Sequence, residues 1–183
     1  MDVLTQKYLD DLYSQDRETQ YQAFLYVLKA TDEPVTWAYE IWDQMVAVLK
    51  HKDNHLRAIA AQLLINLTKS DPQKRMLQDF EALLEVTRDE RFVTARHTIQ
   101  SIWKVGAAGN EQKQVYLDGL ERRFFDCSLE KNCTLIRYDI IQGFRNLYDE
   151  IHDKQVKHKA LELIETETDL KYRKKYTGLW RHL

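Results

Sequence analysis

Apolar residues recur at a helical spacing in several segments of the chain. In residues 56–67 apolar side chains stand at offsets 0, 4, 8 and 11 from the opening residue, and residues 136–147 repeat this pattern. At about 100° per residue, these offsets fall on one side of a helix. The pattern therefore predicts two amphipathic helices with these buried stripes: Leu56, Ala60, Leu64 and Leu67, and Ile136, Ile140, Phe144 and Leu147.

The same pattern extends over most of the chain. Four segments align without gaps, at 56–67, 95–106, 136–147 and 172–183, and a weaker copy opens at Asp16-Arg17. Between them, further periodic segments predict helices around these residues: 4–12, 41–49, 76–84, 115–124 and 156–164. Asp71-Pro72 is typical of a helix start, and Gly106 is a residue that can end a helix in the left-handed conformation. The predicted fold is all-α, with its helices in pairs.

An arginine follows the opening residue of each copy. Counting from Arg17, the arginines are 40, 39, 41 and 36 residues apart: Arg17, Arg57, Arg96, Arg137 and Arg173. One helix pair cannot bury its apolar stripe alone, whereas stacked pairs form a continuous core. The spacing therefore predicts an α-solenoid of about five helical-hairpin repeats, built as a single domain over residues 1–183.

Residues 53–64 resemble a HEAT repeat. The run Asp53-Asn54-His55-Leu56-Arg57, with Ala60, Ala61 and Leu64, is similar to the second-helix pattern D-x-x-V-R-x-x-A-A-x-x-L. The resemblance covers essentially the whole chain and implies a right-handed α-α superhelix whose second helices line a concave surface. It also implies protein–protein scaffolding more often than catalysis. Asp89 departs from the pattern because it lies seven residues before Arg96, so the third repeat is expected to start its second helix a turn earlier.

Positions opposite the buried stripe give a candidate binding patch. Offsets 2, 6 and 9 point away from the core. In the copies at 95–106 and 136–147, which are the third and fourth in chain order, these offsets are occupied by the following residues: His97, Ser101, Lys104, Tyr138, Gln142 and Arg145. Hydrogen-bond donors, fixed positive charges and an aromatic ring suit an acidic peptide, a phosphate-bearing partner or a nucleic-acid backbone. The alternative is an ordinary solvated helix surface.

The repeating arginines favour a structural role. In HEAT repeats this position commonly ties adjacent repeats together through contacts with acids. The resemblance thus implies a structural ladder of Arg57, Arg96, Arg137 and Arg173. Asp53 is a candidate partner of Arg57, and Asp139 is a candidate partner of Arg137 or Arg173.

Charge separates the possible functions. The chain has 27 Lys and Arg against 29 Asp and Glu, a net charge of −2, which argues against a general nucleic-acid binder. The interpretation favoured by the sequence is a non-enzymatic interaction or scaffold module that binds a protein or peptide, with an acidic one as an option. The alternative is a HEAT-like nucleic-acid-binding protein related to alkyl-base DNA glycosylases, which would use Arg137, Tyr138, Asp139 and Arg145. Self-association through the C-terminal repeat, which ends in residues 180–183, is a third hypothesis.

Catalytic and metal-binding patterns are weak. His51 and His55 have the i,i+4 spacing of metal ligands but no H-E-x-x-H pattern, and Cys127 and Cys133 lack a second cysteine pair. We therefore expect free thiols and no enzymatic activity, metal or cofactor. The apolar runs fall far short of the roughly 20 residues that span a bilayer, and the first residues lack the features of a signal peptide. The sequence thus predicts a cytoplasmic protein without a membrane partner.

Overall fold

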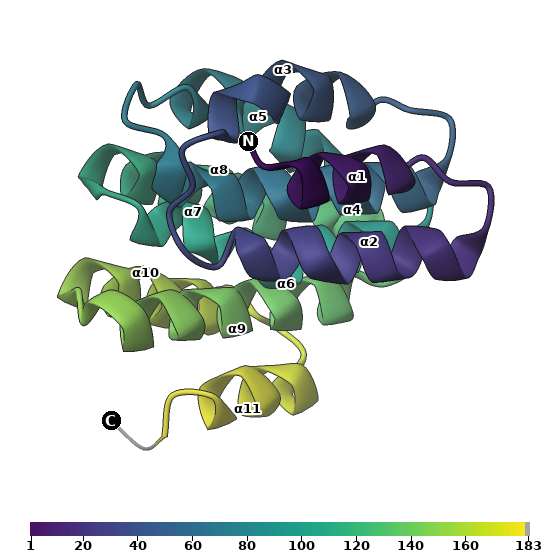
Figure 1. The fold of residues 1–183 in the computed structure, drawn as a ribbon. Coiled ribbons are helices and arrows are strands. Elements are labelled where there is room, and N and C mark those ends of the chain that lie inside the picture. Colours follow the sequence, from purple (N-terminus) through teal and green to yellow (C-terminus); the bar gives the residue numbers. More distant parts are fainter. Residues whose placement is uncertain (182–183) are drawn as a thin grey trace. The chain divides into compact units, whose positions relative to one another are not determined.

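Every regular element in the computed structural model is a helix. The structure describes residues 1–181, so His182 and Leu183 of the predicted segment 172–183 lie outside the described part (Figure 1). The all-α fold predicted from the periodicity is confirmed. Two compact units divide the chain, at residues 1–98 and 99–183. Within residues 1–181, no helix has both the length and the apolar character needed to cross a membrane.

The first unit is built from consecutive helix pairs. Helix α1 packs on α2 and α3 packs on α4, while α4 also contacts α2 and α5. The last residues of α6 belong to the second unit. The elements are α1 (Val3–Asp11), α2 (Arg17–Ala30), α3 (Ala38–Val48), α4 (Asn54–Leu67), the short 3-10 helix η1 (Thr68–Ser70), α5 (Met76–Val86) and α6 (Phe92–Ser101).

The second unit continues the alternation. Helix α9 lies at its centre and contacts α7, α8, α10 and α11, and α10 also packs on α8 and α11. The elements are α7 (Trp103–Ala107), α8 (Asn110–Asp126), the 3-10 helix η2 (Cys127–Leu129), α9 (Cys133–Ile151), α10 (Lys154–Thr166) and α11 (Leu170–Gly178).

Aspartates define where many of the helices begin. In each case the carboxylate accepts a hydrogen bond from a backbone N–H of the first turn, which would otherwise lack a partner. This occurs at the starts of α1, α2, α4, α10 and α11, with the following N-cap residues: Asp2, Asp16, Asp53, Asp153 and Asp169. The spacing of these aspartates is thus one sequence feature that places the helices.

The buried stripes lie where the offsets predict them. All four stripe positions of 56–67 and all four of 136–147 are buried. In the third segment, Ala95, Ile99 and Gly106 are buried, whereas Trp103 is only half-buried. The period of the apolar residues thus identified the core face of these helices correctly.

Three local predictions need correction. Gly106 does not end a helix with a positive φ; it lies buried within α7, where an added Cβ would come within 2.8 Å of Leu147 Cδ2. Its lack of a side chain serves close packing. The Asp71-Pro72 pair precedes α5 by a turn, and Asp71 accepts hydrogen bonds from the N–H groups of Arg75 and Met76. Helix α6 begins four residues before Arg96 and α4 begins three before Arg57, so the expected one-turn difference is absent.

Candidate partner-binding groove

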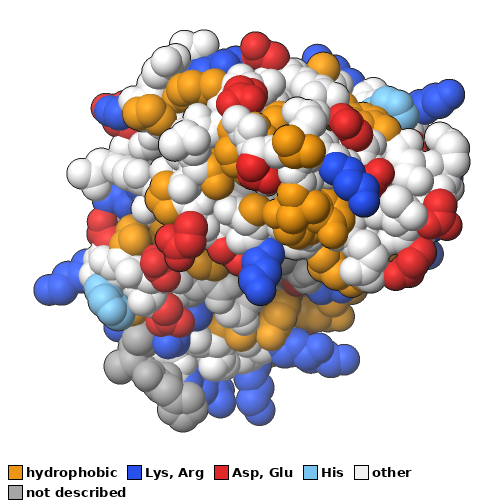
Figure 2. Space-filling view, viewed as in Figure 1, with side chains coloured by type: hydrophobic (Ala, Val, Ile, Leu, Met, Phe, Trp, Pro, Cys, Tyr) orange, Lys and Arg blue, Asp and Glu red, His pale blue; other side chains and the backbone are white. Residues whose placement is uncertain are grey.

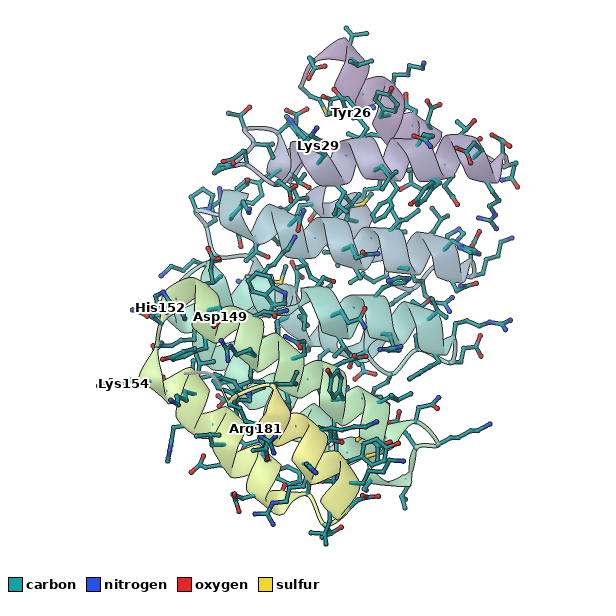
Figure 3. All side chains as sticks on the ribbon, turned by 90° about the horizontal axis from the view of Figure 1, so that it is seen from below. Tyr26, Lys29, Asp149, His152, Lys154 and Arg181 are labelled. Carbon is teal, nitrogen blue, oxygen red and sulfur yellow. The ribbon has the colours of Figure 1, made fainter. Side chains whose placement is uncertain are left out.

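A groove with a volume of about 800 Å³ crosses α2, α4 and α6 in the first unit. Figure 3 shows α2 and α4 side by side, with Tyr26 and Lys29 labelled on the C-terminal half of α2. The groove lies on the earlier parts of these helices. Its walls come from residues 17–25 of α2, residues 54–62 of α4 and residues 91–97 at and within α6.

The groove walls are largely apolar and unusually exposed. Tyr21 is 54% exposed, Leu25 is 39% exposed and Val93 is 65% exposed. Phe24 and Phe92 lie beside them and are half-buried. Contiguous apolar surface of this kind costs solvation free energy in an isolated chain and is typical of a site that another molecule covers.

A second apolar area of the first unit lies on α1 and α2. Figure 2 shows hydrophobic side chains gathered over α1 and α2 among charged ones. Between these two helices Tyr8 of α1 and Tyr26 of α2 stack with their ring centroids 4.0 Å apart, so each ring shields part of the other, while Val3 and Leu4 stay exposed. The groove is the stronger candidate site because its exposed side chains Tyr21 and Val93 line a hollow formed by three helices, which the residues of α1 do not line.

Cationic and imidazole side chains surround the apolar walls. Arg17, His55, Arg91 and His97 line the groove, and its lining includes no carboxylate. This contrasts with the first unit as a whole, where residues 1–98 carry 12 Lys and Arg against 16 Asp and Glu. The groove lining therefore carries positive side chains and no acid on an acidic unit, with Arg17 paired to Asp53 just outside the lining.

Most polar side chains of the lining are bonded within the protein. Gln20 Nε2 donates to the Leu12 carbonyl at 2.8 Å, and Arg17 Nη1 donates to Gln20 Oε1 at 2.8 Å. Thr94 Oγ1 donates to the Asn54 carbonyl at 3.3 Å, which joins α6 to α4. Gln62 Nε2 donates to the carbonyl one helical turn earlier. These bonds hold the groove walls in place.

Arginine–aspartate pairs at the helix starts join the three walls. Arg17 of α2 binds Asp53 at the start of α4 at 3.0 Å, and Arg57 of α4 binds Asp89 before α6 through two bonds of 2.6 and 2.9 Å. Burial raises the pKa of Asp89, but the hydrogen bonds from Arg57 and from the Arg91 N–H outweigh it, so the pKa lies below its usual value. Asp89 is therefore a carboxylate at neutral pH.

The repeating arginines bind different acids from those considered in the sequence. Arg57 binds Asp89, while Asp53 binds Arg17 of the preceding repeat. In the second unit, Arg137 Nη1 binds Glu167 at 3.0 Å. Asp53 is the N-cap of α4 and lies next to Arg17 of α2. This neighbour depends on how the repeats pack. Two further arginines make local contacts: Arg96 lies over the Phe92 ring, and Arg173 pairs with Glu165.

The predicted patch falls on both units. His97 lines the groove of the first unit, whereas the other five residues belong to the second. Ser101, Lys104, Tyr138, Gln142 and Arg145 are all half-buried. Gln142 donates to Asn146 at 2.8 Å, and the Tyr138 ring lies beside the Tyr176 ring.

Arg145 is held by three groups of the second unit. Its Nε binds the Asp149 carboxylate at 2.8 Å, its Nη1 donates to the Leu179 carbonyl at 2.9 Å, and its guanidinium lies over the Trp180 ring. We expect Arg145→Glu to lower the free energy of unfolding by about 1–2 kcal/mol, since it removes these bonds and places two acids one turn apart. Urea denaturation checks this, with the exposed Lys174→Glu on α11 as a control that changes stability by less than about 0.5 kcal/mol. Equal stability of Arg145→Glu and the native chain would contradict a structural role.

Sequence reasoning identified only part of the groove. Leu25, Ala58 and His97 stand at predicted outward positions and do line it. Tyr21, Phe24, Phe92 and Val93 were missed, although the sequence carries a signal. Tyr21 and Val93 are large apolar residues outside the buried stripe of their helices, which is uncommon unless a second apolar surface is needed, whereas Phe24 and Phe92 lie on the stripe side and are half-buried.

Comparisons with known proteins bear on the fold alone. No family model matches the chain, and no curated protein matches it. Among solved structures, one engineered protein of the Northeast Structural Genomics Consortium is similar at a TM-score of 0.60 and 16% identity, covering 98% of this chain and 78% of that chain. Two more engineered proteins have TM-scores of 0.57 at 16% identity. They cover 96% and 98% of this chain, and 46% and 79% of their own. These matches agree with the all-helical fold.

The two cysteines and His51 make contacts within the chain, whereas His55 is exposed and lines the groove. Cys127 and Cys133 are free thiols, and burial, with Cys133 nearby, raises the pKa of Cys127 to about 12. His51 Nδ1 accepts a hydrogen bond from the Asp53 N–H at 3.0 Å. Among residues 1–181, no three His, Cys, Asp or Glu side chains lie together as metal ligands.

Proposed function

We propose that this chain is a HEAT-like α-solenoid that acts as a non-enzymatic interaction module and binds a segment of a partner protein in the groove of α2, α4 and α6. The observation that carries the proposal is the open apolar wall of the groove. Tyr21, Leu25 and Val93 lie on the outward faces of helices whose opposite faces already form the core. Their exposure adds nothing to the packing of the chain itself, so a function in binding accounts for them.

The stacking contacts support the solenoid part of the proposal. In three places an arginine at the start of one second helix binds an acid near the start of the next: Arg17 with Asp53, Arg57 with Asp89, and Arg137 with Glu167. Bonds that recur at equivalent positions are typical of repeats stacked in register. Within each unit, such contacts keep neighbouring second helices in register.

The nucleic-acid alternative is less favoured by the contacts. It depends on Asp139, Arg137 and Arg145 of the second unit. Asp139 is buried and accepts a hydrogen bond from Gln100 at 3.2 Å. Arg137 binds Glu167 and the Phe124 carbonyl, and Arg145 binds Asp149. Charges already neutralised within the protein add little to phosphate binding, which depends on free cations.

Ala58→Arg tests the proposal. Ala58 is a half-buried alanine of α4 in the groove, and arginine is a good helix former that would place a long charged chain over the apolar walls. The matched control is Ala82→Arg, on the half-buried Ala82 of α5, outside the groove. We expect partners captured by the native chain from lysate to decrease at least about tenfold with Ala58→Arg and to be retained with Ala82→Arg.

The capture experiment has clear contrary outcomes. Equal capture by the native chain and Ala58→Arg would contradict binding in the groove. Val93→Arg serves as a second groove variant, because its site is well exposed and tolerates a long side chain. Binding of duplex DNA that weakens steeply with salt and is unchanged by either groove variant would favour the nucleic-acid alternative.

A further inference from the structure

We infer that the groove of the first unit binds an amphipathic α-helix of a partner protein whose polar side is acidic. This inference rests on the proposed function and specifies the chemistry of the partner. Three independent features of the groove lead to it: its apolar walls, the state of its polar groups and the sign of its charges.

The apolar walls match one side of a helix. Exposed apolar side chains come from each of two outer helices, with Tyr21 and Leu25 on α2 and Val93 on α6, and Ala58 of α4 lies between them. A small residue at the centre leaves room for a bulky side chain of the partner. Apolar residues at positions i, i+3, i+4 and i+7 of a bound helix would fill such a groove.

The polar groups favour a helix over an extended strand. A bound extended peptide has unpaired backbone N–H and C=O groups that the groove must satisfy, whereas a helix bonds its own backbone. The amides of Gln20 and Gln62 and the hydroxyl of Thr94 already have bonds to carbonyls of this chain. The amide and hydroxyl groups of the lining are thus committed within the chain, and its arginine and imidazole groups lie at the rim, where they suit carboxylates better than a ladder of peptide backbone groups.

The charges favour an acidic partner. Arg17 and Arg91 lie at the starts of the two outer helices, with His55 and His97 beside them, and no Asp or Glu lines the groove. Arg17 shares its charge with Asp53, but its side chain is still 57% exposed. Carboxylates that flank the apolar side of a bound helix would meet this cationic rim, and lysines would be repelled.

The groove dimensions set the length of the bound helix. Packed helices lie about 8–10 Å apart, so a groove that crosses three of them extends over roughly 20 Å. At about 1.5 Å per residue, a helix of roughly 14 residues covers this distance. The expected ligand is thus a three- to four-turn segment with apolar residues on one side and Asp or Glu on the other.

Selection from a displayed library of random 18-residue peptides tests the inference, with the full chain as target. We expect enriched peptides to have apolar residues at helical spacing and a net negative charge. A synthetic copy should gain helical circular dichroism on binding. Its affinity should fall at least about tenfold for Ala58→Arg, remain unchanged for Ala82→Arg, and fall at least about tenfold when its acids are replaced by lysine.

The outcomes separate this inference from the proposed function. The acidic-helix inference would be overturned if the enriched peptides were basic, contained proline within the bound segment or bound without gaining helicity. If such peptides nevertheless failed to bind Ala58→Arg, the groove would still be the binding site. Binding that is equal for the native chain, Ala58→Arg and Val93→Arg would overturn the proposed function itself. Failure to enrich any peptide would count against both.

Discussion

Replacing Arg57 by alanine is expected to lower the free energy of unfolding by about 3 kcal/mol, because it leaves a buried carboxylate without its partner. The Arg57 and Asp89 side chains are 14% and 5% exposed, and two hydrogen bonds join them. Arg17→Ala is the matched control, since Arg17 holds the same repeat position but its side chain is 57% exposed and that of Asp53 is 26% exposed, so this pair is more open to water. An exposed pair contributes less than about 1 kcal/mol.

Urea denaturation followed by circular dichroism measures both variants, with the transition of the first unit analysed separately if two transitions are seen. We expect Arg57→Ala to lower the free energy of unfolding by at least about 2 kcal/mol more than Arg17→Ala does, because the Arg57–Asp89 pair is the more buried of the two. Similar, small losses for both variants would show that the arginine contacts do not order the stack.

The Arg57–Asp89 pair also gives a pH dependence. The pKa of Asp89 in the folded chain lies below its ordinary value of 3.8, so the pair contributes fully to stability above that pH. The contribution is lost as the pH falls through the lowered pKa of the folded state. Arg57→Ala removes the hydrogen bonds that lower this pKa, so the variant should lose less stability than the native chain on acidification below pH 3.8.

The second large effect separates core leucines from groove leucines. Leu64→Ala should lower the free energy of unfolding by about 3 kcal/mol, because Leu64 is fully buried in α4 and its removal leaves a cavity. Leu25→Ala should cost less than about 1 kcal/mol, because the side chain on α2 is 39% exposed. Thermal or urea denaturation measures both changes.

The same pair of variants connects stability to binding. If the groove is a binding site, Leu25→Ala weakens partner capture while the chain stays folded, so the two properties respond to different leucines. A large loss of stability for Leu25→Ala would mean that the groove wall belongs to the core. In that case packing within the chain would explain why these residues are apolar, and no binding partner would be needed.

The sequence predicted what depends on local periodicity. The stripe from Leu56 to Leu67 specifies its own helix face, and Asp53 specifies where α4 begins, because both signals lie within one helix. Ile65 shows the limit of this approach. It stands at an offset expected to face outward, yet it is buried, because neighbouring helices cover more of α4 than one stripe.

Contacts between distant segments were beyond sequence reasoning. Arg145 was predicted to face a partner, and nothing in the sequence indicated that its guanidinium also bonds the carbonyl of Leu179, the C-cap of α11, 34 residues away. Asp53 was predicted to bind Arg57, but in the stacked repeats it binds Arg17. The groove itself needs three helices to form, so Tyr21 and Val93 could be identified as a site only after α2 and α6 were placed beside α4.

The most direct test of the groove is photo-crosslinking in the cells from which the sequence comes. A benzophenone amino acid at Val93 samples the groove, and the same residue at Leu129 of η2, which is 97% exposed, samples an apolar surface of the other unit. The account predicts discrete adducts at position 93 that disappear when Ala58→Arg is added, and few at position 129. Adducts at position 129 with none at position 93 would contradict it.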